Sequence, residues 1–222
     1  MTKKEPVMTR ALAMSFISDY YHNDNPTEED KFLFVEAMLF LIHTFHKPED
    51  MHNLAFFYLE ERRFDLEVKY LEMAAEYGYG PAIEELGYIW YYGQTGSVDY
   101  KKAHRYFEIG AGSADDIVRT SCRYKLADMY HYGYFVEKDE EKYRSMIEAL
   151  YEEISDPSGL IDLYSLSYLP FPDIAYRLAG IRIEQGRKEE THDCSPTASP
   201  KRSSRRRRAF ASPFPPCSAM RG

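Results

Sequence analysis

Residues 82–93 read AIEELGYIWYYG, and residues 122–133, forty positions further on, read CRYKLADMYHYG. The two stretches align without a gap, and a leucine, an aromatic residue and a glycine recur at matching positions: Leu86 and Leu126, Trp90 and Tyr130, Gly93 and Gly133. A fixed period of this length is the sequence signature of stacked structural repeats. The chain is therefore predicted to contain consecutive copies of one folding unit.

The spacing inside each copy predicts a pair of helices. Leu86 and Trp90 are four residues apart and fall on one helical face. Gly93 predicts a helix end, because glycine readily takes the left-handed conformation that follows a last turn. Asp99 is placed to cap a second helix, and Asp139 takes the same position in the next copy.

Small residues at the packing positions of the repeat predict that its helices approach one another closely: Ala82, Gly87, Cys122 and Ala127. Cys122 replaces the alanine of the preceding copy, so it is expected to be a buried packing thiol. One helix pair cannot bury its own apolar face, whereas stacked neighbours can.

Weaker copies of the unit are predicted on both sides of this pair. Before it, Leu54 and Ala55 match the leucine and the small residue of the repeat. After it, residues 172–187 predict the first helix of a further unit, and residues 187–190 are expected to open its second helix. Repeats are thus expected over residues 49–190, with the last unit incomplete.

Residues 1–48 are predicted to form a separate N-terminal helical hairpin. Its helices are expected at residues 9–21 and 28–46. Thr27 and Asp30 resemble a capping box at the start of the second helix, with Asp in place of the usual Glu or Gln. Pro48 is predicted to end that helix.

The charge of the chain is divided unevenly. Seven of the 28 Lys and Arg but only one of the 36 Asp and Glu lie in residues 191–222, which leaves a net charge of −14 on residues 1–190. So acidic a body would repel nucleic acid and anionic membranes, and it would suit solubility or a basic partner. No apolar stretch reaches the roughly 20 residues of a membrane span, and a cytoplasmic protein is expected.

Residues 191–222 are predicted to be a disordered tail, because they are rich in Pro, Ser and Arg and poor in apolar residues. Two interpretations stay open. The tail is either a native basic arm for nucleic acid or nuclear import, or an aberrant, out-of-frame C-terminus that replaces the missing partner helix.

The repeat pattern resembles the Sel-one-like repeat family, a subclass of the tetratricopeptide superfamily, over roughly residues 50–155. The resemblance is carried by Ala82, Leu86, Gly87, Trp90, Gly93, Val98, Asp99, Tyr100, Ala103, Phe107 and Ala111. Ser97 and Tyr143 depart from the family pattern. The resemblance implies an all-α fold, a right-handed α-solenoid of antiparallel helix pairs used as an adaptor surface.

In such stacks the first helices of the pairs line the concave surface, which makes their polar and aromatic residues the candidate partner-binding site: Tyr88, Tyr91, Tyr92, Asp128, His131 and Tyr132. Tyrosine offers a large contact area at low entropic cost. For Tyr91 and Tyr92, exposure and packing between repeats are both open, whereas Tyr88 is expected to be exposed.

No catalytic, metal or cofactor site is predicted. His43 and His46 lie three residues apart on one predicted helix, with His52 near, but a metal site needs a third ligand and a converging geometry. Glu84 and Glu85 point about 100° apart on a helix, so they do not face one site. The glycines follow no phosphate-loop pattern.

The leading functional prediction is therefore a scaffold or adaptor that binds a protein or peptide, with a basic segment the best fit and no small-molecule substrate. The alternative is a nucleic-acid-associated or regulatory protein that acts through the basic tail.

Overall fold

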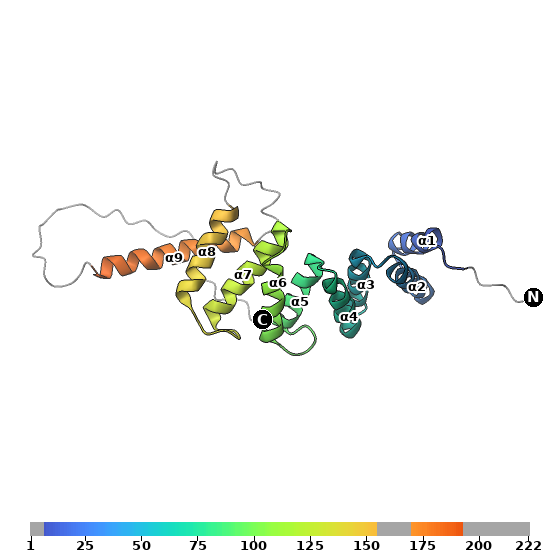
Figure 1. Cartoon of the computed structure of the whole chain (residues 1–222), viewed down its shortest axis with the longest axis horizontal. Helices are drawn as coiled ribbons and strands as arrows, with labels where there is room; N and C mark the ends of the chain where they lie inside the picture. The colour runs from blue at the N-terminus through green and yellow to red at the C-terminus, as the bar shows by residue number, and fades with distance from the viewer. Residues whose placement is uncertain (1–6, 155–169, 193–222) are drawn as a thin grey trace, which may run out of the picture. The chain divides into compact units, whose positions relative to one another are not determined.

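The computed structural model describes residues 7–154 and 170–192, and the chain divides into two units, residues 1–183 and 184–222. Within the described residues the backbone forms nine α-helices and no strand (Figure 1), which confirms the predicted all-α class. The helices are α1 (Arg10–Tyr21), α2 (Glu28–Phe45), α3 (Pro48–Glu60), α4 (Phe64–Glu76), α5 (Gly80–Tyr92), α6 (Tyr100–Gly110), α7 (Asp116–Tyr132), α8 (Glu140–Ile154) and α9 (Phe171–His192). The predicted tail lies, beyond His192, outside the described residues.

Local capping signals set most of the helix boundaries. Thr27 and Asp30 form the predicted capping box at the start of α2. Gly93 and Gly133 end α5 and α7 in the left-handed conformation, with φ of 70° and 73°. The side chain of Asp115 accepts hydrogen bonds from two backbone N–H groups at the start of α7.

Two predicted boundaries are wrong. Pro48 does not stop α2, which ends when His46 adopts a left-handed φ of 52°; Pro48 instead occupies the first turn of α3. This is the helical position that proline tolerates best, since the N–H it lacks has no partner there. Residues 187–190 do not open a new helix either, because they continue α9 to His192.

The two repeats found in the sequence make the same contacts. The side chain of Asp99 accepts from the N–H of Lys102 at 3.0 Å, and that of Asp139 accepts from the N–H of Lys142 at 2.9 Å. Each aspartate also donates its own N–H to the carbonyl of the repeat aromatic, Trp90 or Tyr130. The ammonium groups of the two lysines lie over those rings, 3.7 and 3.9 Å from their centroids.

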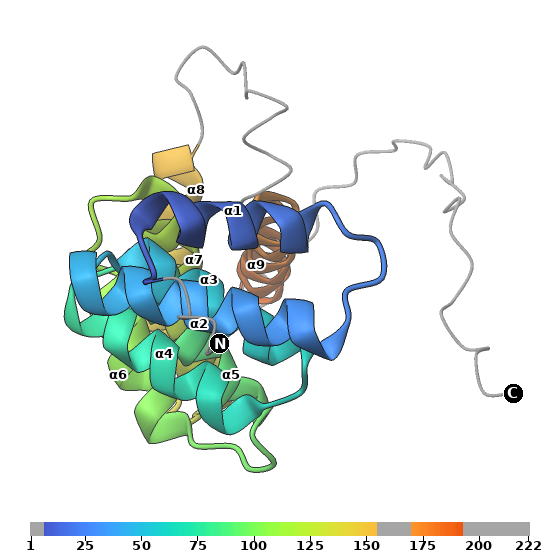
Figure 2. The ribbon, with the colours of Figure 1, turned by 90° about the vertical axis from the view of Figure 1, so that its right-hand side faces the viewer.

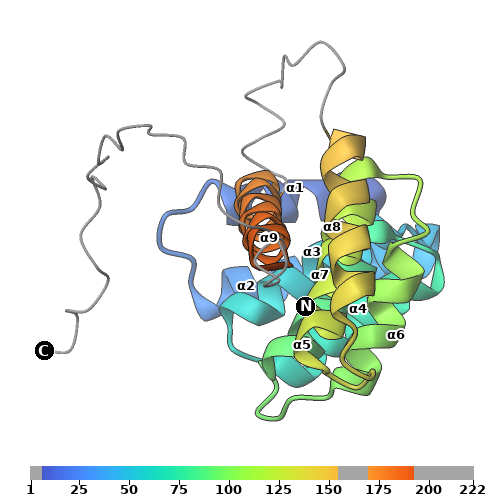
Figure 3. The ribbon, with the colours of Figure 1, turned by 90° about the vertical axis from the view of Figure 1, so that its left-hand side faces the viewer.

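Within residues 1–183, consecutive helices pack on one another. The most extensive contacts join α1 with α2, α3 with α4, α5 with α6, and α7 with α8. Figure 2 shows α1 beside α2, and Figure 3 shows α8 lying along α7. Contacts also join α5 with α7, the first helices of neighbouring repeats. The part of α9 up to Ile183 buries Ile174, Leu178 and Ile181 in the same cluster as residues of α7 and α8.

Close approach of α5, α6 and α7 depends on two glycines. A Cβ at Gly87 would overlap the ring of Phe107, which is fully buried. A Cβ at Gly110 would overlap Sγ of Cys122, which is also fully buried. The predicted role of small residues in helix approach is confirmed, and Gly110 extends it to a position that the sequence pattern did not single out.

We predict that Gly87→Ala lowers the free energy of unfolding by about 1–3 kcal/mol, because overpacking forces buried neighbours out of place. Gly180 in α9 is the matched control, since a Cβ there meets nothing within 4 Å. Gly180→Ala is expected to raise stability by roughly 0.5–1 kcal/mol through helix propensity. Urea titrations followed by circular dichroism measure both effects, and equal behaviour of the two variants would contradict the role of Gly87.

Glu67 of α4 is a buried carboxylate. Its side chain is 4% exposed, and Oε2 accepts no hydrogen bond. Burial, followed by the negative charge of Glu85 on α5, raises the pKa of Glu67 to about 7. The folded protein therefore holds this proton more tightly than the unfolded chain does.

From the sign of this shift, the Glu67 contribution favours folding most below pH 4.5 and is lost as the pH rises through 7. Glu67→Gln keeps the shape and cannot ionise. We predict that its melting temperature matches that of the unaltered protein at pH 5 and exceeds it at pH 8. Thermal melts across this range test the prediction, which a difference independent of pH would contradict.

Candidate functional site

The six predicted site residues lie on α5 and α7, and an ammonium group lies among four tyrosine rings there. Nζ of Lys125 is 5.3–5.6 Å from the ring centroids of Tyr88, Tyr91, Tyr92 and Tyr124. It donates a hydrogen bond to the hydroxyl of Tyr92 at 3.0 Å. Tyrosine faces attract cations, so Lys125 holds the two helices together at this point.

Lys125 was not singled out from the sequence. Its contact with Tyr92 spans 33 residues and arises only when α5 and α7 stack. One signal in the sequence could have indicated Lys125. Asp128 lies three residues after it on the same helix, which is a favourable spacing for an ion pair.

Asp128 is an internal residue and not a surface contact, which corrects its predicted place on an open face. Its side chain is only 3% exposed. An oxygen of its carboxylate lies 2.7 Å from Nη1 of Arg177 on α9, and the other lies 3.5 Å from Nζ of Lys125. Burial raises the pKa of Asp128, and the two cations oppose that shift. This ion pair fixes α9 against α7.

The expectation of an exposed Tyr88 is also wrong. Its hydroxyl lies 2.8 Å from Oγ of Ser121, and the side chain is half-buried between the helices. Burial raises the pKa of Tyr88 well above its usual value. Of the two tyrosines left open, Tyr91 is packed, at 8% exposure, and Tyr92 is exposed, at 57%.

A continuous series of ring contacts, here called the aromatic ladder, connects the two repeats. Its members are Tyr88, Tyr91, Tyr92, Tyr100, Tyr132 and Tyr134. Tyr100 and Tyr134 stack at 4.3 Å and 6°, and Tyr134 continues to Tyr132 at 5.3 Å. Tyr132 is 50% exposed, so the ladder presents Tyr92 and Tyr132 outward. Of its other rings, Tyr91 is buried, whereas Tyr88, Tyr100 and Tyr134 are half-buried.

His131 supports one end of the ladder. Nδ1 of its ring lies 3.1 Å from Oε2 of Glu140, and the ring centroid lies 4.6 Å from that of Tyr132 and 4.4 Å from that of Tyr143. These contacts hold the imidazole between α7 and α8. His131 therefore packs against Tyr132, and 31% of its side-chain surface stays exposed.

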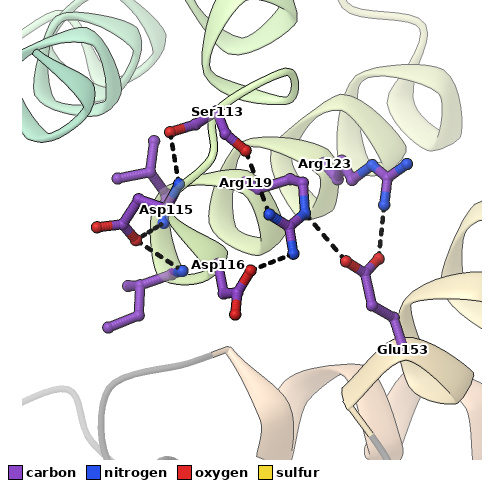
Figure 4. Close-up of polar contacts among 8 residues, drawn as sticks. Ser113, Asp115, Asp116, Arg119, Arg123 and Glu153 are labelled. Carbon is purple, nitrogen blue, oxygen red and sulfur yellow. Dashed lines mark hydrogen bonds and ion pairs between the residues drawn. The ribbon is translucent and has the colours of Figure 1, made fainter.

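A polar network at the start of α7 has a structural role. Figure 4 shows Arg119 and Arg123 pointing toward Glu153 of α8, whose two carboxylate oxygens accept at 3.0 and 2.5 Å. Arg119 also donates to Asp116 and to the carbonyl of Ser113. The carboxylates of Asp116 and Glu153 are both bound to guanidinium groups. The network therefore fixes α8 on α7, and these two carboxylates do not form a pair for proton transfer.

The remaining candidates for chemistry are separated or buried. His43 and His46 are exposed on α2 and at its end, whereas His52 lies 3.1 Å from Glu85. In residues 7–154 and 170–192, no three His, Cys, Asp or Glu side chains are grouped as metal ligands would be. Burial raises the pKa of the Cys122 thiol to about 12, so it is held as a thiol.

Over the same described ranges, none of the helices combines the length and apolar character that crossing a bilayer requires.

The described residues thus define an all-α protein of consecutively packed helix pairs, which is compatible with a helical-repeat fold. Comparison with models of protein families and with curated proteins gives no match for this chain. The resemblance to Sel-one-like repeats is accordingly carried by the residues of the two repeats.

We predict that Arg177→Met costs up to about 3 kcal/mol of stability, because it removes the nearer of the two cations that form ion pairs with the buried Asp128 in the described residues. Adding Asp128→Asn to Arg177→Met removes the uncompensated charge and is expected to restore part of that loss. Arg182→Met is the control, at an exposed position of the same helix where the guanidinium lies 6.0 Å from the ring centroid of Tyr151, and is expected to change stability by no more than about 1 kcal/mol. Denaturant titrations of all three variants measure this, and equal losses in the first two would contradict the ion pair's importance.

Proposed function

We propose that this protein is a scaffold that binds a partner protein or peptide along the aromatic ladder. In this proposal the helix pairs are antiparallel and stack as a right-handed α-solenoid of the Sel-one-like type. The protein acts without a cofactor, metal or small-molecule substrate, and works in the cytoplasm.

The observation that carries the proposal is the presentation of Tyr92 and Tyr132. Each is half or more exposed, at 57% and 50%, although each packs on other rings of the ladder. A tyrosine held in this way loses little conformational entropy on binding. Rigid aromatic side chains are the usual energetic centres of protein interfaces.

Charge favours a basic partner. Residues 1–190 carry a net charge of −14, which attracts basic segments over distances of about a Debye length and raises association rates. Arginine and lysine side chains also bind favourably over tyrosine faces. A basic peptide segment therefore meets both the field of the protein and the chemistry of the ladder.

The alternative, nucleic-acid binding through the basic tail, depends on residues that lie mostly outside the described ranges. It stays a prediction from the charge of residues 191–222. Binding that falls steeply with salt and disappears when those residues are deleted would favour it over the scaffold proposal.

We predict that the double variant Tyr92→Ala and Tyr132→Ala loses at least tenfold in recovery of partners from an extract of the native organism. The two rings are half or more exposed, but their removal also breaks the Lys125–Tyr92 hydrogen bond and ring contacts of the ladder, so thermal melts check that the variant is folded at the temperature of the capture. The matched control is Tyr77→Ala with Tyr176→Ala, which removes tyrosines that are 56% and 81% exposed outside the ladder.

Quantitative mass spectrometry of proteins captured on the immobilised full chain measures the recovery. Equal capture by the ladder variant and the control variant would exclude the ladder as the binding surface. Loss of capture in both would show that any exposed tyrosine matters equally, which also contradicts the proposal.

A further inference from the structure

A small pocket lies far from the aromatic ladder in sequence, where the end of α1 meets α2 and α3. Its volume is about 200 Å³. Aromatic rings and one carboxylate form most of the lining: Tyr20, Tyr21, Phe34, Phe56, Phe57 and Glu60.

The rings form a floor and walls. Phe34 is fully buried and Phe57 is 6% exposed, with their ring centroids 5.0 Å apart. Tyr20 lies 4.4 Å from Phe34, and Tyr21 meets Phe34 edge-on at 5.6 Å and 84°. Tyr21 and Phe56 remain 61% and 52% exposed. The buried phenylalanines therefore form the floor of the pocket, and the exposed rings form walls that are open to solvent.

The electrostatic field in the pocket is negative. Glu60 lines it, and among the described residues no cation is within ion-pair distance of this carboxylate. Burial, followed by the charge of Glu60, raises the pKa of both Tyr20 and Tyr21. The nearby cation Lys31 is already bound to Glu28 at 3.1 Å and to Glu61 at 2.8 Å.

These features favour a cation that needs few hydrogen bonds. The exposed rings of Tyr21 and Phe56 and the Glu60 carboxylate attract positive charge. The acceptors in the lining are Glu60, the Asn23 amide and the tyrosine hydroxyls, whereas the phenylalanines offer none, so an ammonium N–H turned toward them would be costly to leave unpaired. A methylated ammonium has the charge without that requirement. The volume is below the roughly 300 Å³ at which pockets for drug-sized ligands begin, so it suits one head group on a longer molecule.

We propose that this pocket binds the trimethylated lysine side chain of a basic segment in a partner protein. Charge complementarity decides the source of the head group: the net charge of −14 on residues 1–190 favours a basic peptide over a zwitterionic lipid surface. The pocket is separate from the aromatic ladder, and this inference does not depend on the ladder's role.

The test is calorimetric titration of the full chain with a short lysine- and arginine-rich peptide that carries one trimethyl-lysine. The comparison peptide has a tert-butyl group in place of the trimethylammonium, which keeps the shape and removes the charge. We expect the charged peptide to bind about tenfold more tightly, equivalent to about 1.4 kcal/mol. Equal affinity of the two peptides, or no binding at millimolar concentration, would overturn the proposal.

Variants identify the pocket as the site. Phe56→Ala and Glu60→Gln change exposed side chains and are expected to weaken binding at least fivefold, whereas Tyr21→Phe keeps the ring and is expected to bind normally. Thermal melts check that each variant is folded. Unchanged affinity in both Phe56→Ala and Glu60→Gln would overturn the assignment.

Two further arms separate this site from other sources of binding. The Tyr92→Ala and Tyr132→Ala variant is expected to bind the trimethyl-lysine peptide normally, so failure of the ladder proposal leaves this one testable. Free choline is expected to compete weakly with the peptide. Tighter binding to phosphatidylcholine vesicles than to the peptide would overturn the assignment to a protein partner.

Discussion

The fold depends on how closely α6 approaches its two neighbours. Gly87 admits the ring of Phe107, and Gly110 admits the thiol of Cys122. With these contacts in place, α5 and α7 come near enough for the tyrosines of one helix to surround the lysine of the other. Larger side chains at the two glycines would move the helices apart and separate the ring contacts that cross from one repeat to the next.

The tyrosines serve two purposes that the structure divides between them. Tyr88 and Tyr91 join the repeats to one another. The ammonium group of Lys125, on the next repeat, lies over both of their rings, and the Tyr88 hydroxyl contacts Ser121. Tyr92 and Tyr132 keep half or more of their surface for solvent. The same residue type thus both packs the repeats together and forms the proposed binding surface, because tyrosine combines an apolar ring with a polar hydroxyl.

What could be predicted from the sequence is local, and what could not is long-range. The cap of Asp99 on Lys102 and the box of Thr27 with Asp30 close within three residues, so the pattern alone was sufficient. Pro48 was misassigned because a proline can follow one helix and begin the next. Tyr124 meets Asp173 across 49 residues, as Lys125 meets Tyr92 across 33, and such pairs exist only after the helices have stacked. Asp128 can be buried because Arg177 on α9 forms an ion pair with it. No sequence motif indicates that these two residues meet.

Trp90 is the single tryptophan of the chain, and it lies beneath the ammonium group of Lys102 in one repeat, where Tyr130 and Lys142 take its place in the next. Its fluorescence therefore observes one helix pair, whereas the amide signal of circular dichroism averages over all of them. Stacked arrays can lose their units separately. The gap between the two melting profiles would measure directly how strongly neighbouring units are coupled, without any engineered label.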